Sequence, residues 1–175
     1  MLLEHIHKVK AITAKQASLL LCPKAKQREV IAKRRLRKIY QAGEVKRTRE
    51  HVGAPYVYYV EKKLKNWDHR LKITDFYIKH EPYIVNWNLE AIIGNLRADC
   101  LMDIEIYSKR YLIALEVELT GTANIKKYED LYLSGEWQKY IPVFPIVCVS
   151  GRFRQSKIIK AVGESELLDE ICRYG

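Results

Sequence analysis

The spacing of apolar residues predicts a helical first third followed by a strand-rich remainder. Apolar positions in residues 2–9 recur at helical intervals and predict a first helix. A second helix is predicted to begin at Thr13, because Thr13 and Gln16 have the spacing of a capping box. This helix is predicted to end near Pro23, since proline disfavours helical geometry in the residue before it.

A third helix is predicted between the turn at residues 23–26 and Gly43, where glycine favours a helix end. Ala32, Leu36 and Ile39 share one side of this helix at 3.6 residues per turn. Basic residues occupy the other side: Lys33, Arg34, Arg37 and Lys38. One face is therefore expected to pack on the first two helices, and the other to face solvent or a ligand.

After Gly43 the pattern changes to that of strands. Residues 45–50 and 56–62 alternate or are rich in β-branched and aromatic residues, and the turn-forming cluster 51–55 separates them. A β-hairpin directly after a basic helix is typical of a winged helix-turn-helix.

The remaining two thirds of the chain predict an α/β arrangement. The predicted order is helix, three strands, helix, strand and helix, with a hairpin turn at residues 107–110. The segments are a linker at 62–68, a helix at 69–79, strands near 81–90, 97–107 and 109–119, a helix within 121–137, a buried strand at 141–150, and a C-terminal helix from about Gln155.

Acidic residues stand where this sheet is otherwise apolar. Glu116 and Glu118 share one face of their strand, because side chains alternate along a strand. A hairpin with the preceding strand brings Asp99 towards both of them. Two carboxylates in an apolar strand are costly unless they are paired or bound to a cation. Clustered carboxylates suit Mg²⁺ or Mn²⁺ in phosphodiester cleavage, so we assign Asp99, Glu116 and Glu118 as candidate metal ligands.

Composition excludes several classes of protein. Of 175 residues, 48% are hydrophobic, which is enough for a packed core and excludes a wholly disordered chain. No apolar run approaches the roughly 18 residues of a bilayer span, and no secretory signal is recognisable. Four scattered cysteines without a Cys-x-x-Cys pair argue against a zinc ribbon or a disulfide scaffold. We expect a cytoplasmic protein that does not contact membranes.

The charge of the chain is unevenly divided. Residues 1–65 contain 17 Lys and Arg against 5 Asp and Glu, a net charge of +12, whereas residues 66–175 have a net charge of −2. This predicts two domains, 1–65 and 66–175, of which the first binds double-stranded DNA without a cofactor. Arg34 and Arg37 are the candidates for base contacts. The candidates for phosphate contacts are Lys33, Lys38, Lys46, Arg47 and Arg49.

The acidic strands resemble the PD-(D/E)xK nuclease fold. Arg97-Ala98-Asp99 is similar to its first motif, with alanine in place of proline, and Glu116-Val117-Glu118 is similar to its second. The resemblance implies that Asp99 and Glu116 bind metal and that a lysine assists. Glu118 stands where that lysine is expected, so the resemblance leaves Lys126 or Lys127, on the next helix, to supply it.

The whole chain resembles the replication-relaxation family of plasmids and mobile elements of bacteria, over roughly residues 5–160. Beyond the winged helix, the pieces that carry the resemblance are His69-x-Leu71, Arg97-x-Asp99, the segment 116–120 (E-V-E-x-T), Lys126, Lys127 and Tyr128, and the strand IVCVS followed by Arg152 and Arg154. The resemblance implies a DNA-binding domain joined to a nuclease-like domain, with a role in plasmid replication or DNA mobilisation.

The predicted fold class is an α+β winged helix followed by an α/β restriction-endonuclease-like domain. The first functional hypothesis is a DNA-binding protein of a bacterial plasmid or mobile element, acting in replication, mobilisation or transcription control, with an inactive nuclease-like domain. The alternative is a Mg²⁺- or Mn²⁺-dependent endonuclease using Asp99, Glu116, Glu118 and Lys127. A purely structural role stays open, with the two Glu side chains paired to basic residues and the basic helix face merely solvated. The oligomeric state, monomer or homodimer, is also left open.

Overall fold

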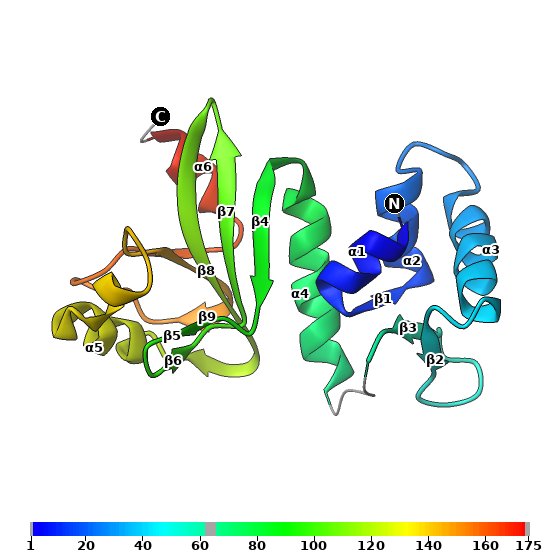
Figure 1. The fold of residues 1–175 in the computed structure, drawn as a ribbon, viewed down its shortest axis with the longest axis horizontal. Coiled ribbons are helices and arrows are strands. Elements are labelled where there is room, and N and C mark those ends of the chain that lie inside the picture. The colour runs from blue at the N-terminus through cyan, green and yellow to red at the C-terminus, as the bar shows by residue number, and fades with distance from the viewer. Residues whose placement is uncertain (1, 62–65, 174–175) are drawn as a thin grey trace. The chain divides into compact units, whose positions relative to one another are not determined.

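The computed structural model describes residues 2–61 and 66–173, and the chain has a mixed α+β fold. By its internal contacts it divides into two compact units, Met1–Glu81 and Pro82–Gly175. The first unit contains helices and a small sheet, and the second contains a five-stranded mixed sheet with helices (Figure 1).

Three helices and a three-stranded antiparallel sheet make up most of the first unit, and a fourth helix follows them. Its elements are α1 (Leu2–Val9), β1 (Ala11–Thr13), α2 (Ala14–Leu21), α3 (Arg28–Gln41), β2 (Lys46–Thr48), β3 (Val57–Tyr59) and α4 (Trp67–His80). The sheet order is β1-β3-β2, so β2 is an edge strand. The predicted first three helices and the hairpin are confirmed, whereas β1 was not predicted.

Local sequence explains the helix boundaries. Thr13 caps α2 by accepting a hydrogen bond from the Gln16 backbone N–H, and the Gln16 side chain accepts one from Thr13, which confirms the capping box. Just past the end of α3, Gly43 has a φ of +77°, a left-handed conformation that glycine adopts without strain.

Helix α4 belongs to the first unit, so the contact-based boundary falls after Glu81 rather than after residue 65. Two buried polar contacts explain this: Thr74 Oγ1 donates to the Ala11 carbonyl at 2.9 Å, and Gln16 Nε2 donates to the Leu71 carbonyl at 2.8 Å. Residues 62–65 of the predicted linker 62–68 lie outside the described residues, and Trp67 and Asp68 already belong to α4.

The second unit is built on a sheet with strand order β10-β9-β8-β7-β4 (Figure 1). Strands β4, β7 and β8 pair antiparallel, whereas β8, β9 and β10 pair parallel. The elements are η1 (Glu81–Tyr83, which begins in the first unit), β4 (Ile84–Leu89), β5 (Ile92–Ile93), β6 (Leu96–Arg97), β7 (Cys100–Ile106), β8 (Lys109–Ala123), α5 (Lys126–Ser134), η2 (Glu136–Lys139), β9 (Ile146–Phe153), β10 (Ala161–Gly163) and α6 (Leu167–Arg173).

Helix α5 packs one apolar face on this sheet. Tyr128 and Leu131 of α5 are buried in a cluster with Ala114 of β8 and Val147 and Val149 of β9. The strand β9 is buried on both faces over residues 147–150, as expected of a central strand.

The prediction of a helix from about Gln155 is wrong. The chain first forms β10, and the C-terminal helix α6 begins only at Leu167. Ser156 explains the difference, because its hydroxyl accepts hydrogen bonds from the backbone N–H groups of Ile158 and Ile159 and donates one to Glu129. These bonds hold a turn that competes with a helix.

Candidate functional site

Helix α3 presents a continuous basic surface. Ala32 and Leu36 are its buried residues, and the side that carries them lies against α2. The predicted DNA-contacting side chains of this helix are all exposed: Lys33, Arg34, Arg37 and Lys38. Arg35, which the sequence prediction did not include, is exposed as well. We call these five residues of α3 the basic face.

The hairpin β2–β3 carries the other predicted DNA contacts, and two of the three are already engaged within the protein. Lys46 Nζ donates to the Glu61 carbonyl at 2.9 Å. The guanidinium carbon of Arg47 lies 4.2 Å from the centroid of the Tyr40 ring and 4.4 Å from that of Tyr56. Arg49 is exposed and lies 5.1 Å from the Tyr56 centroid.

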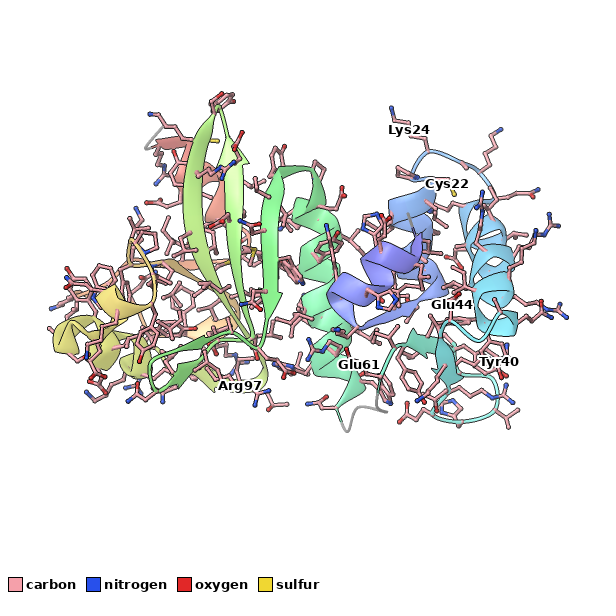
Figure 2. All side chains as sticks on the ribbon, viewed as in Figure 1. Cys22, Lys24, Tyr40, Glu44, Glu61 and Arg97 are labelled. Atoms are coloured by element: carbon pink, nitrogen blue, oxygen red, sulfur yellow. The ribbon has the colours of Figure 1, made fainter. Side chains whose placement is uncertain are left out.

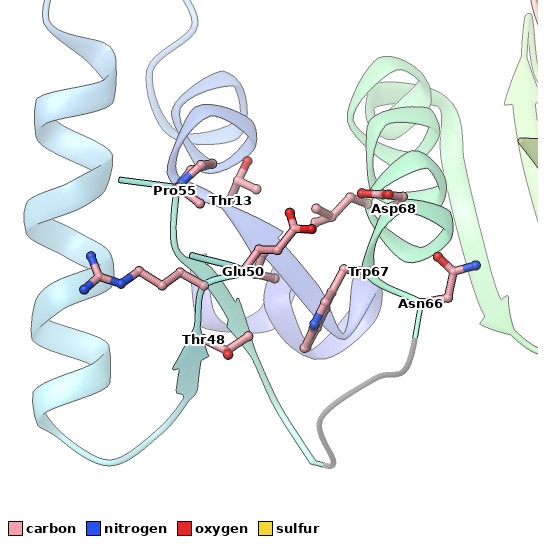
Figure 3. Close-up of a pocket in the computed structure, with 11 residues that line it drawn as sticks. Thr13, Thr48, Glu50, Pro55, Asn66, Trp67 and Asp68 are labelled. Carbon is pink, nitrogen blue, oxygen red and sulfur yellow. The ribbon is translucent and has the colours of Figure 1, made fainter. Parts of the chain in front are cut away.

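A hollow of about 740 Å³ lies between the hairpin and the start of α4 (Figure 3). Its wall includes Trp67, the acidic residues Glu50 and Asp68, and one basic residue, Arg49. These acidic side chains disfavour a phosphate, so the hollow is a poor seat for a nucleic-acid backbone. The basic face of α3 is therefore the better candidate interface in this unit.

The second candidate site lies where β7 begins and β8 runs beside it. The register Cys100↔Leu115 places Asp99 beside Glu116 and Val117. Asp99 Oδ2 accepts a hydrogen bond of 2.8 Å from the Val117 backbone N–H. The hairpin thus brings Asp99 to Glu116, as the sequence predicts.

Glu116 is largely buried, with a side chain 13% exposed. Its Oε1 lies 2.8 Å from Lys127 Nζ and accepts a hydrogen bond of 2.5 Å from the Tyr128 hydroxyl. Burial raises the pKa of Glu116 above its ordinary value, against the opposing effects of Lys127 and Tyr128, and the negative charge of Asp99 adds to the rise.

Helix α5 supplies both partners of Glu116. Lys127 Nζ also donates to the Arg97 carbonyl at 3.1 Å, so its ammonium bridges β6 and β8. Tyr128 is fully buried, and burial together with the adjacent Glu116 raises the pKa of its phenol strongly. The site therefore holds Tyr128 as a neutral donor to Glu116. The spacing of Ile125, Tyr128 and Leu131 places Tyr128 on the buried side of a helix, a signal available in the sequence.

Glu118 is not brought to this group as predicted. Its Oε1 instead accepts hydrogen bonds from the backbone N–H groups of Thr120 at 3.1 Å and Gly121 at 2.9 Å. These N–H groups lie where the pairing of β8 with β9 is interrupted, between Val117 and Thr122. Within residues 2–61 and 66–173, no set of three or more His, Cys, Asp or Glu side chains is arranged to hold a metal ion.

Two general findings complete the description. Every helix in the described part of the chain falls short of the length and hydropathy needed to cross a lipid bilayer. Comparisons with protein-family models, with curated proteins and with solved structures found no match to this chain.

Proposed function

We propose that the chain binds double-stranded DNA through α3 and the hairpin β2–β3, in the manner of a winged helix-turn-helix. The observation that carries the proposal is the basic face of α3, on which five Lys and Arg side chains are exposed while the apolar side of the helix is buried. An exposed helix with clustered Arg and Lys fits the major groove, where guanidinium groups read guanine and ammonium groups meet phosphates.

The charge distribution supports the same assignment. Residues 1–65 carry a net charge of +12, which attracts a polyanion. On the resemblance to the replication-relaxation family, we extend the proposal to a protein of a bacterial plasmid or mobile element. Its role there is replication, mobilisation or transcription control, with a restriction-endonuclease-like second domain.

Fluorescence anisotropy with labelled duplex DNA over a range of salt concentrations tests this proposal. The double variant Arg34→Ala/Arg37→Ala is expected to lose most affinity and to reduce the slope of log K against log salt, by about 0.9 for each phosphate that the protein no longer neutralises. A matched control, Lys109→Ala/Lys157→Ala, removes the same charge from exposed positions of the second unit. Equal affinity loss in both variants would contradict a specific interface on α3.

A second candidate function is metal-dependent phosphodiester cleavage at Asp99 and Glu116. The observation that favours it is the 2.8 Å contact between Lys127 Nζ and Glu116, because a lysine is then present although Glu118 stands at the usual lysine position. The sequence predicts an inactive domain because Glu118 stands at the usual lysine position, and this reason weakens if Lys127 supplies the ammonium. Cleavage is thus an open second candidate for this domain.

The residues present suit one divalent cation held by two carboxylates. Mg²⁺ is commonly bound by one or two carboxylates together with water and substrate phosphate, so Asp99 and Glu116 suffice without Glu118. When bound, the cation supplies Lewis-acid activation of the phosphodiester and of water. Lys127 and Tyr128 orient the Glu116 carboxylate, and Lys127 also favours its ionised form.

Incubation of supercoiled plasmid with the protein and Mg²⁺ or Mn²⁺ decides between the two readings of this domain. Nicking that disappears in Glu116→Gln but persists in Glu105→Gln establishes the enzyme, since Glu105 is exposed and paired with Arg110. DNA binding without nicking in either metal leaves a binding protein with an inactive domain.

A further inference from the structure

The side chain of Arg47 is enclosed by tyrosines from two different elements. Its guanidinium carbon lies 4.2 Å from the ring centroid of Tyr40, in the last turn of α3, and 4.4 Å from that of Tyr56, just before β3. Figure 2 marks Tyr40 at the end of α3 beside the hairpin. Arg47 thus contacts the helix and the hairpin at the same time.

A third tyrosine lies opposite Arg47 in the sheet. Arg47 and Tyr58 are directly opposite each other in the antiparallel pair β2–β3, so their side chains lie on one face. Tyr58 is buried, so the face of the sheet under Arg47 is formed by a fixed ring. The guanidinium thus lies over a face on which tyrosines surround it.

The hairpin needs such an anchor. Strand β2 has only three residues and is an edge strand, whereas β3 is paired on both sides, with β1 and with β2. Backbone pairing therefore holds β2 along one side only. Arg47 is the residue of β2 whose side chain reaches α3, because it stacks on Tyr40.

These observations separate Arg47 from the phosphate contacts with which the sequence grouped it. Lys33 and Lys38 on α3 are exposed and free to meet a phosphate, whereas Arg47 is half-buried among tyrosines. A planar guanidinium stacks on aromatic faces in a way that an ammonium does not reproduce. The guanidinium of Arg47 and the tyrosine rings around it therefore both favour a contact within the protein over a contact with phosphate.

We propose that Arg47 is a positioning residue, which fixes the edge strand of the hairpin against α3 and so sets the hairpin in place for DNA. The expected effect of Arg47 on DNA affinity rests on the proposed function, whereas the attachment of β2 to α3 does not depend on DNA binding. The chemical partner of Arg47 is thus the pair of rings Tyr40 and Tyr56 rather than the DNA backbone.

Hydrogen exchange of the full chain without DNA tests the fixing of the hairpin. In Arg47→Gln, amides of residues 46–59 are expected to exchange about five- to thirtyfold faster, the range expected when two cation–π interactions are removed. In Arg47→Lys these amides are also expected to exchange faster than in the wild type, because an ammonium does not stack as a planar group on both rings. Tyr40→Leu is expected to do the same, whereas Tyr40→Phe keeps the ring and the protection. Arg49→Gln is the matched control in the same hairpin, because Arg49 approaches one ring only.

DNA affinity supplies the second readout. A positioning role predicts that Arg47→Lys loses about as much affinity as Arg47→Gln, although it keeps the charge. Wild-type affinity in Arg47→Lys, together with unchanged hydrogen exchange in both variants, would overturn the proposal and return Arg47 to the phosphate contacts. If the wild-type chain binds no DNA, the proposed function fails, and the exchange measurement still decides whether Arg47 fixes the hairpin.

Discussion

Lys127 Nζ lies 2.8 Å from Glu116 Oε1, so a lysine from the helix that follows β8 meets this carboxylate. The position two residues on belongs to Glu118, whose carboxylate is bonded to the backbone of Thr120 and Gly121. Lys127 and Glu118 thus have different partners, although Glu118 is the closer of the two to Glu116 along the chain.

The contact between Lys127 and Glu116 predicts that Lys127 and its neighbour Lys126 differ in their effect on cleavage. If the site cleaves DNA, Lys127→Gln is expected to reduce the rate of metal-dependent plasmid nicking by about a hundredfold or more, because Glu116 loses its cationic partner. Lys126→Gln is the control, since Lys126 is exposed and paired with Asp130 instead. Nicking rates of the two variants in Mn²⁺ give the answer, and equal rates would show that Lys127 has no part in cleavage.

Glu116 also gives a prediction for stability that needs no ligand. Burial raises the pKa of Glu116 above its ordinary value of 4.5, so the folded protein holds this proton more tightly than the unfolded chain does. The contribution of Glu116 to stability therefore falls as the pH rises from 4.5 through the raised pKa, and stays at its lower level above it. Glu116→Gln removes this ionisation.

Urea unfolding at about pH 4 and about pH 7 measures the effect. The free energy of unfolding of Glu116→Gln minus that of the wild type is expected to be larger at neutral pH than at acidic pH. At acidic pH the wild-type carboxyl is itself mostly protonated and resembles the amide. Glu105→Gln, at an exposed position paired with Arg110, is the control and is expected to lack this change. A Glu116→Gln variant whose stability relative to the wild type is equal at both pH values would contradict the raised pKa.

The elements that the sequence predicts well are those with strong local signals. The capping pair Thr13 and Gln16, the stop at Gly43 and the alternation around Glu116 each act over a few residues, and the structure contains the corresponding helix start, helix end and strand. Asp99 and Glu116 meet because strand pairing follows from the short turn at Tyr107 and Ser108, both with positive φ.

The features that were not predicted depend on distant contacts. Strand β1 has only three residues and is a strand because it pairs with β3, and α4 joins the first unit through the bonds of Thr74 and Gln16. Glu118 bonds to the backbone of Thr120 and Gly121 where the ladder between β8 and β9 is interrupted, and alternation along one strand does not reveal this interruption. The hairpin β5–β6 did have a signal, since Gly94-Asn95 between apolar residues is typical of a tight turn.

The capping box of α2 predicts a measurable loss of stability in the first unit. Thr13→Ala removes the acceptor for the Gln16 backbone N–H and is expected to lower the free energy of unfolding by about 1 kcal/mol. Thr13→Ser keeps the hydroxyl and is expected to recover most of this loss. Thermal or urea unfolding followed by circular dichroism compares the two, and an unchanged Thr13→Ala variant would show that the cap contributes nothing.

Gly151 predicts a large effect of a small substitution on the stability of the second unit. It follows the buried part of β9 with a φ of +144°, which side-chain-bearing residues rarely adopt, and a Cβ at this position would lie 2.3 Å from the Glu118 carbonyl oxygen. Both backbone strain and a clash with main-chain atoms therefore oppose Gly151→Ala. We expect a loss of about 3 kcal/mol or more in the free energy of unfolding.

The neighbouring Gly121 provides a matched control on the other side of the same interruption in the sheet. A Cβ at Gly121 would meet the Glu118 carboxylate at 3.5 Å, an ordinary contact, and its backbone N–H remains available to Glu118. Gly121→Ala is therefore expected to change stability by less than about 1 kcal/mol. Because the close approach of Gly151 to Glu118 is the cause of the difference, equal unfolding midpoints for the two alanine variants would show that β8 and β9 do not meet as described at this point.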